Sequence, residues 1–255
     1  MRKSMLKTTL KGLFLLLFSF SVTSPVYSAC EDEAKPQVNW VNCDLSGKTF
    51  KNKDLSNAVL TGATFDGADF SGATLENADL NFASLKDTRF DGARMTNAKL
   101  VSVKAQAASF RDAVLDRSRL SRAMLKDADF TGVRAADSNF YDADLVAAVF
   151  IGARLKSANF ESSDLSRANF NGAVLQQAVL RNAKLHDTTL IKADLSKTNI
   201  DESDCRGADF TEADLSKASF RNAEIEESSF DGAILKDTTW SNYKRCRASS
   251  IGVCE

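Results

Sequence analysis

Large apolar residues recur at every fifth position along most of the chain. From residue 45 to residue 240, every position divisible by five is Leu, Phe, Ile, Met or Trp, except Ala105, Ala135 and Cys205, and no insertion or deletion breaks the phase. A small residue, most often Ala, stands two positions before almost every one of them. An α-helix repeats about every 3.6 residues and a strand about every 2, so neither can hold a period of five. The pattern therefore predicts a repeat architecture in which each five-residue unit places the same side chains inward.

A second period, of twenty residues, divides the inward positions into walls. The series that starts at Leu55 contains no Phe, whereas nine of the ten residues in the series that starts at Phe50 are Phe. One turn of the chain is therefore predicted to take four five-residue units, so that like side chains stack on like. The predicted core ladder consists of Phe50, Phe70, Phe90, Phe110, Phe130, Phe150, Phe170, Phe210 and Phe230.

Two of the exceptions to the five-residue rule come with a compensating change nearby. Ala105 and Ala135 are small where a large residue belongs, and Val103 and Val133 stand two positions earlier, where Ala is the rule. Packed cores tolerate exchanges that keep the total volume nearly constant. Both pairs therefore indicate a packing constraint on the inward positions.

The repeat units themselves match a known pattern. Residues 68–72 read Ala-Asp-Phe-Ser-Gly and residues 213–217 read Ala-Asp-Leu-Ser-Lys, which fit Ala-(Asp/Asn)-(Leu/Phe)-X-X. On these units the chain resembles the pentapeptide-repeat family over roughly residues 43–240. The resemblance implies an all-β fold, a right-handed quadrilateral parallel β-helix whose Ala and Leu or Phe residues point inward. About ten coils would give a rod roughly 48 Å long at the usual spacing of β-strands.

Both ends of such a solenoid expose a cross-section of its core and need caps. At the start, residues 29–42 are predicted to form the N-terminal cap, with Trp40 in phase with the repeat and covering the first coil. The repeat region then spans residues 43–240. Residues 241–255 are predicted to fold over the final coil as a C-terminal cap.

The first 28 residues have the composition of a cleaved secretory signal. Arg2, Lys3, Lys7 and Lys11 precede an apolar run that is too short to remain in a bilayer as a spanning helix, and the predicted cleavage falls before Ala29. We therefore expect an exported bacterial protein, periplasmic or secreted, without a transmembrane segment in the mature chain. An alternative is a lipid anchor at Cys30, because residues 28–30 resemble the end of a bacterial lipobox.

Four of the five cysteines lie in the two predicted caps. Disulfides persist in exported proteins, and a bridge that closes a short loop beside an open core would hold the cap in place. We therefore predict one bridge within each cap, Cys30 with Cys43 and Cys246 with Cys254, although sequence alone does not determine connectivity. Lipidation of Cys30 would remove the first bridge.

The sequence offers no catalytic, metal or cofactor site. Cys205 occupies an inward position and is expected to be a buried, apolar-like thiol. His186, the only histidine, follows an inward Leu and is expected to be solvated. Glycines such as Gly62, Gly67 and Gly72 are expected at corners of the coil. No nucleophile–base pair or metal-ligand cluster can be built from these residues, which argues against an enzyme.

Charge is distributed unevenly along the chain. Residues 29–82 carry a net charge of −5, residues 83–134 carry +5 and residues 194–240 carry −7. Bands of this kind orient a protein partner, or other copies of the rod, by long-range attraction. The mature chain, with 29 basic and 34 acidic residues, is not basic enough for a nucleic-acid binder. The candidate partner surface consists of Arg89, Arg94, Lys99, Lys104, Arg119, Asp204, Asp209, Asp214 and Glu224.

These observations favour a non-enzymatic, exported structural or interaction module that presents a rigid surface to an unidentified protein partner or to itself. The family resemblance suggests an alternative, because some pentapeptide-repeat proteins are acidic, DNA-shaped rods that protect or inhibit a type II topoisomerase. The export signal and the basic band both oppose that interpretation. An effector delivered to another cell is compatible with export, but no dedicated feature of the sequence supports it.

Overall fold

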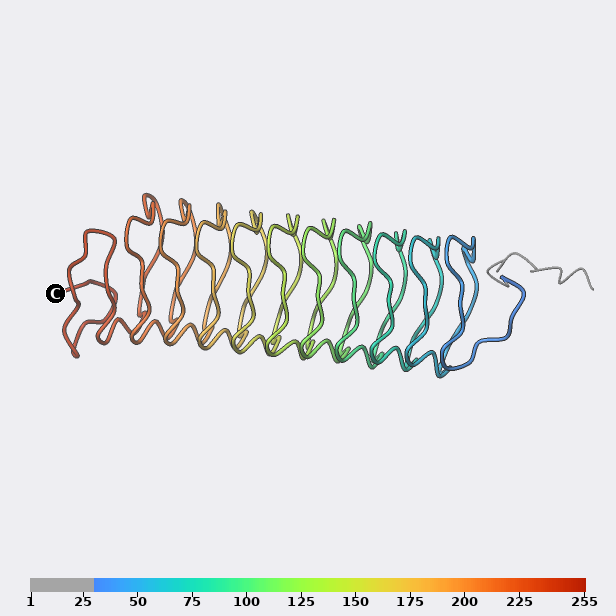
Figure 1. The fold of residues 1–255 in the computed structure, drawn as a ribbon. Helices are drawn as coiled ribbons and strands as arrows, with labels where there is room; N and C mark the ends of the chain where they lie inside the picture. The colour runs from blue at the N-terminus through green and yellow to red at the C-terminus, as the bar shows by residue number, and fades with distance from the viewer. Residues whose placement is uncertain (1–29) are drawn as a thin grey trace, which may run out of the picture.

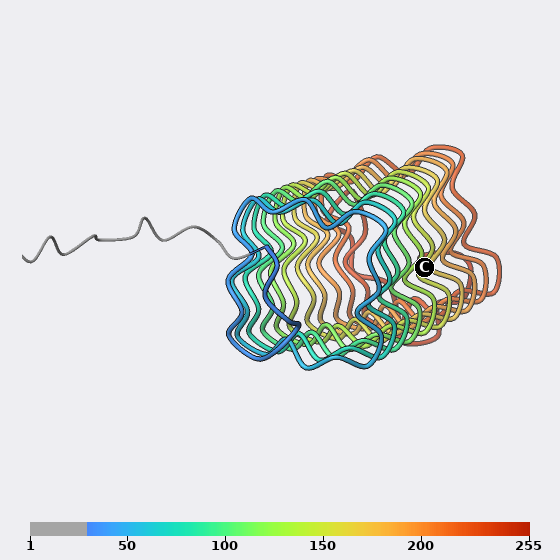
Figure 2. The same cartoon turned by 90° about the vertical axis from the view of Figure 1, so that its right-hand side faces the viewer.

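The computed structural model describes residues 30–255, and the predicted signal peptide, residues 1–28, lies outside this range. Within the described residues there is no α-helix, and β pairing consists of bridges one residue wide. Apart from two antiparallel bridges made by the C-terminal segment, each bridge is parallel and joins residues twenty positions apart, from Asn39 with Val59 to Ser219 with Thr239. The chain is thus a right-handed β-helix in which one turn takes twenty residues and carries four bridges. The turns stack into an elongated rod, with the first described coil (blue) and the last coil (red) at its opposite ends (Figures 1 and 2).

Each five-residue unit turns a corner through one residue in the left-handed region. Every residue numbered with a final 2 or 7, from Gln37 to Asp237, has a φ between 54° and 69°. The predicted corner glycines obey this rule, but so do Phe82 and Arg117, for which this conformation costs about 1–2 kcal/mol. The stack offsets this cost, since the N–H at each corner from Gln37 to Asn222 donates to a carbonyl of the next turn, as from Phe82 to Val101 at 3.0 Å.

The preference for Asp or Asn just before each inward apolar residue has a direct cause. The Oδ1 atom of Asp69 accepts the backbone N–H of Ser71 at 2.9 Å, and this contact recurs wherever Asp or Asn occupies the position in well-formed corners, as at Asn159 with Glu161. Such Asx contacts satisfy a corner donor that the bridges leave unpaired. The outward polar positions of the repeat therefore stabilise the backbone as well as solvating the rod.

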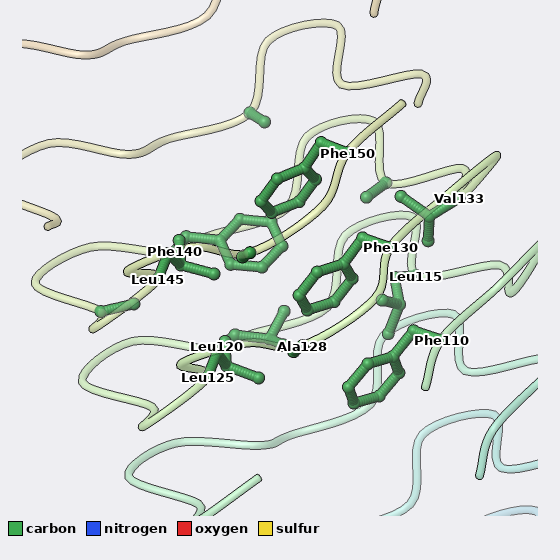
Figure 3. Close-up of a cluster of buried hydrophobic side chains, with 14 of the residues drawn as sticks. Phe110, Leu115, Leu120, Leu125, Ala128, Phe130, Val133, Phe140, Leu145 and Phe150 are labelled. Carbon is green, nitrogen blue, oxygen red and sulfur yellow. The ribbon is translucent and has the colours of Figure 1, made fainter. Parts of the chain in front are cut away.

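The rings of the predicted phenylalanine ladder stack along one wall of the core (Figure 3). The ring centroids of Phe110 and Phe130 lie 4.8 Å apart with an interplanar angle of 2°. The ladder breaks at Leu190 and resumes with Phe210 and Phe230, whose centroids lie 5.0 Å apart. Stacked rings add contact energy to the burial of their apolar area. This wall fixes the axial register of the coil on one side.

A second, shorter aromatic column stands on the opposite wall of the core, half a turn away, and the sequence analysis missed it. Phe140 and Phe160 stack on each other at 4.8 Å, and Phe160 meets Phe150 of the ladder edge-to-face at 5.8 Å and 88°. Figure 3 shows Phe140 lying between the ladder rings Phe130 and Phe150. Edge-to-face contacts of this kind are a favourable aromatic geometry. The central coils are therefore locked by rings from two directions.

The volume exchange inferred from the sequence lies inside the core. Ala105 and Ala135 are fully buried, and so are Val103 and Val133 (Figure 3 labels Val133 beside the ladder). The valine methyl groups thus occupy the interior on the same turns at which the central side chain is small. Close packing of this interior explains why two reductions in size are each accompanied by an increase two residues away.

The segment predicted as the N-terminal cap contains the first unit of the coil. Residues 36–40 already form a corner and a bridge. The reason is that Val38 and Trp40 are both in phase and buried. The Trp40 ring lies 5.1 Å from that of Phe50 and 6.4 Å from that of Phe65, so it covers the first turn of the core.

The C-terminal segment, residues 241–255, folds back over the last turn. It makes two antiparallel bridges, Ile251 with Ile234 and Arg245 with Thr239. These bridges cover two of the four bridge positions of that turn. No helix in the described part of the chain is long and apolar enough to cross a membrane.

Candidate interaction surfaces

The predicted basic residues form a ring around the rod instead of a patch on one side. Arg89, Arg94, Lys99 and Lys104 occupy four consecutive outward bridge positions, which together make up a single turn. All four side chains are exposed. Only Arg119 joins one of them on the same side, because it pairs with Lys99 one turn later. The twenty-residue period, applied to these positions, would have revealed this arrangement.

Ion pairs engage part of this ring. The guanidinium of Arg89 lies 3.1 Å from Asp91, and Arg94 lies 2.5 Å from Glu76. Lys99 pairs with Asp79 at 3.3 Å. Such exposed pairs each contribute roughly 0–1 kcal/mol and remain open to exchange with a partner's charges. Among the described residues, Lys104 and Arg119 have no carboxylate within ion-pairing distance.

The predicted acidic residues also follow successive sides of the rod. Asp204, Asp209 and Asp214 occupy three consecutive bridge positions, and Glu224 pairs with Asp204 one turn later. Asp209 and Asp214 each accept a backbone N–H at their own corner at 2.9 Å, from Thr211 and Ser216. These two carboxylates therefore stabilise the backbone at their corners and also contribute to the negative surface charge.

Asp204 and Glu224 share one cation. Arg206 Nη2 lies 2.6 Å from Asp204 Oδ2, and its Nε lies 3.3 Å from Glu224 Oε2. The hydrogen bond from the Arg206 side chain holds the pKa of Asp204 below its usual range, and the neighbouring carboxylates raise the pKa of Arg206. The charge of Arg206 is therefore largely committed within the rod.

A shallow groove of about 420 Å³ runs along one corner of the rod near its C-terminal end. The only histidine stands in it, with Nδ1 of His186 3.0 Å from the Arg206 carbonyl oxygen and Nε2 3.2 Å from Asp187 Oδ2. His186 is exposed, as the sequence predicted. No group of three or more metal-ligating side chains occurs among residues 30–255. The groove is lined by Ser166, Lys184, His186, Asp204, Arg206, Glu226 and Glu227.

Cys205 lies inside the coil and is not available for chemistry at the surface. It is fully buried, and its Sγ atom contacts the Ser203 hydroxyl at 3.4 Å. Burial raises the pKa of the Cys205 thiol to about 12. A thiol that stays protonated and inaccessible is a poor nucleophile, so its place in the core is that of a small apolar residue.

Both caps contain a disulfide. Cys30 is bonded to Cys43, and Cys246 is bonded to Cys254. These are the pairings inferred from the positions of the cysteines. The bond at Cys30 occupies the sulfur that a lipid anchor would require, so the arrangement in the structure is incompatible with lipidation there.

Models of the pentapeptide repeat match most of the chain. A model described as a pentapeptide repeat region matches residues 83–160 and 153–230, and a model of pentapeptide repeats in eight copies matches residues 39–77. The chain therefore belongs to the pentapeptide-repeat family. No curated protein matches the chain in sequence.

Several solved structures of the same family are similar to the chain. HetL, a pentapeptide repeat protein involved in heterocyst differentiation regulation from the cyanobacterium Nostoc sp. strain PCC 7120, is 23% identical, with 82% of this chain and 92% of that chain aligned and a TM-score of 0.43. QnrB1, a plasmid-mediated fluoroquinolone resistance protein, is 18% identical over 74% and 85%, with a TM-score of 0.36. Rfr23 from the cyanobacterium Cyanothece 51142 is 23% identical over 49% and 89%, with a TM-score of 0.28.

Proposed function

We propose that this chain is an exported, non-enzymatic interaction module, a four-sided rod of about ten coils whose charged bands bind a protein partner or another copy of the rod. The observation that carries the proposal is the uninterrupted repeat from residue 36 to residue 240, with charge segregated along its length. A surface of this kind is rigid and regular, which reduces the ordering cost of binding.

The distance between the two bands gives the partner a specific requirement. Lys104 and Glu224 lie on the same side of the rod and are six turns apart, roughly 29 Å at the usual strand spacing. A partner that reads both bands must present acidic and basic groups with a similar separation. Complementary charge at two positions fixes orientation as well as attraction.

Export is supported by the disulfides and by the sequence before residue 29. Bridges in both caps are typical of proteins that mature in an oxidising compartment. The basic and apolar segments of residues 1–28 supply the sequence features of a secretory signal. We therefore place the mature protein in the periplasm or outside the cell.

The topoisomerase alternative has less support. A DNA mimic would need a continuous acidic strip, whereas the ring of basic side chains at residues 89–104 interrupts every side of the rod. A supercoiling assay with gyrase and the mature protein tests the alternative directly. Inhibition or protection at micromolar concentration would favour it.

The proposal is tested by crosslinking in intact cells, fractionation and identification of the captured proteins. We expect the protein in the envelope or medium, and a partner whose recovery falls as salt screens the bands. Reversal of the two unpaired basic residues, Lys104→Glu with Arg119→Glu, should reduce recovery. Arg154→Glu is the matched control, because Arg154 is exposed at a bridge position outside the bands. Equal recovery in molar salt, or a cytoplasmic protein that retains Met1, would contradict the proposal.

A further inference from the structure

Two sides of the rod end without a covering strand at the C-terminal end. Ile234 and Thr239 are covered by residues 245 and 251, as described above. Glu224 and Ser229, on the other two sides, pair only backward, with Asp204 and Asp209. The stretch from residue 223 to residue 230, called the open edge below, is therefore the last layer of the coil on these sides.

The backbone of the open edge has unused hydrogen-bonding groups that point along the rod axis. One turn earlier, the N–H groups of Cys205, Gly207 and Phe210 donate to the next layer at 2.8, 3.0 and 2.8 Å. Among the described residues, the equivalent N–H groups of Ile225, Glu227 and Phe230 have no protein acceptor, and the carbonyls of residues 223 and 228 have no donor. These groups have the spacing that one further parallel strand would use.

Apolar side chains lie directly beneath these groups. Cys205 and Phe210 are fully buried, because the next turn covers them. Ile225 and Phe230 are only half-buried, and the Trp240 ring leans on Phe230 with centroids 4.9 Å apart. A strand laid on the open edge would therefore gain apolar contacts as well as backbone hydrogen bonds.

The rim of the open edge is strongly acidic. Glu224, Glu226, Glu227 and Asp231 are all exposed. Among the described residues, the last three have no ion-pair partner, and Arg206 contacts Glu224. The groove at this corner adds Asp204, since Glu226 and Glu227 also line it. The same rim would repel a second copy of this end, which disfavours pairing of two open edges.

We propose that the open edge receives an extended segment of a partner protein as an additional β-strand, and that the segment carries lysine or arginine side chains between apolar ones. Its backbone would pair with Ile225, Glu227 and Phe230, its apolar residues would cover Ile225 and Phe230, and its cations would meet the acidic rim. This inference rests on the proposed function only in requiring a protein partner. It assigns that partner a distinct site and chemistry.

A synthetic ten-residue peptide of alternating valine and lysine tests the site in the full mature protein. Saturating peptide should slow amide hydrogen exchange at Ile225, Glu227 and Phe230 by about tenfold, since exchange requires the new hydrogen bonds to open. The same peptide with N-methyl groups at alternate residues keeps its charge but cannot pair as a strand, and it should have no such effect. A version with glutamate in place of lysine should bind weakly or not at all.

A matched pair of variants separates the rim from general acidity. Glu227→Lys should weaken binding of the valine–lysine peptide about fivefold, the effect of losing one exposed charge contact of about 1 kcal/mol. Glu202→Lys is the control, because Glu202 is an exposed corner residue of the same acidic band with a φ of 60°, against 61° for Glu227. The variant that reverses two residues of the basic band, Lys104→Glu with Arg119→Glu, should bind the peptide as the unmodified protein does.

Three outcomes would overturn the inference. These are equal binding of the N-methylated peptide, unchanged exchange at the three amides, or a concentration-dependent dimer in sedimentation that already protects these amides without peptide. A partner captured in cells whose binding is unaffected by Glu227→Lys would leave the proposed function standing and remove only the open edge from it.

Discussion

The two ends of the rod are closed by different means. At the N-terminal end, residues 36–40 continue the parallel coil backward, and Trp40, the last residue of this segment, is almost fully buried. At the C-terminal end, the chain reverses after Trp240 through a corner at Tyr243, where φ is 66°, and returns antiparallel. Trp240 remains only half-buried. One end therefore keeps the register of the repeat, whereas the other abandons it.

This difference separates two requirements of a solenoid cap. Covering the core needs one large side chain in phase, and Trp40 supplies it at the start. Satisfying the strand edge needs a further layer on every side, which the antiparallel return provides on only two sides. A cap can meet the first requirement without meeting the second, and the exposed edge is then blunted by charge or used for binding.

The largest expected effect on stability comes from removing the Trp40 side chain. Trp40→Ala should lower the free energy of unfolding by about 3–5 kcal/mol, since it removes a buried indole from a closed site. Trp240→Ala should cost about 1–2 kcal/mol, because its ring is half-exposed. Denaturant unfolding of the two variants gives the comparison. Equal losses would show that the two ends are closed equally well.

The disulfides should stabilise the two ends to a similar extent. Loop-closure entropy predicts about 3 kcal/mol for the bridge that spans 13 residues and about 2.5 kcal/mol for the one that spans 8. Thermal melts of Cys30→Ser with Cys43→Ser, and of Cys246→Ser with Cys254→Ser, measure both values. A much larger loss for the second pair would indicate that the antiparallel return depends on its bridge.

Substitutions at corner glycines should have the same effect on stability at both ends of the rod. Gly47 lies in the first full turn with a φ of 64°, and Gly232 lies in the last with a φ of 66°. A Cβ atom added at Gly47 would meet nothing within 4 Å. One added at Gly232 would meet only side-chain and backbone atoms of Glu212, all at 3.4 Å or more, which is ordinary van der Waals distance. Gly47→Ala and Gly232→Ala should therefore each cost about 1 kcal/mol, the conformational penalty alone. Unequal melting temperatures would place additional strain in one end.

Acid should loosen the first turn by a small amount and leave the corner at Lys236 in the last turn unaffected. Hydrogen bonds from the Ser46 hydroxyl and N–H lower the pKa of Asp44, and Ser56 does the same for Asp54. A lowered folded-state pKa means that the stabilisation is complete above the unfolded value of about 3.9 and is lost as pH falls through the folded value. Amide exchange at Ser46 and Ser56 should therefore accelerate in acid, relative to the amide of Lys236.

The control for this effect is the replacement of both carboxylates by amides. Asp44→Asn with Asp54→Asn keeps an oxygen that accepts the corner N–H and removes the titration. The difference between Ser46 and Lys236 should then no longer depend on pH. Ile234 occupies the position of the last turn that is equivalent to Asp54, so the amide of Lys236 has no carboxylate two residues before it.

The period of five and the period of twenty were sufficient to predict most of the interior. Phe110 and Phe130 stack because twenty residues make one turn, and that spacing is visible in the sequence. The second aromatic column was equally visible, since Phe140, Phe160 and Phe220 share one phase, but these rings are scattered among Leu residues. The ring of basic side chains also follows from the same arithmetic.

Other features could not be predicted from residue types. The left-handed corner at Phe82 contradicts the preference of a bulky side chain, and only the hydrogen bonds of the assembled stack impose it. The open edge depends on which backbone groups find partners after Trp240, where the repeat no longer specifies the path of the chain. Local pattern therefore determined the coil, whereas its termination required three-dimensional structure.

The twenty-residue turn has a consequence for how this molecule can change length. Duplicating one whole turn would lengthen the rod and keep every downstream side chain on its original side, whereas duplicating a single unit would rotate everything after it by one side. Because each residue bonds only to the turns immediately before and after it, neither event would disturb distant contacts. Adding or removing whole turns between Lys104 and Glu224 would therefore change the distance between them in steps of one strand layer.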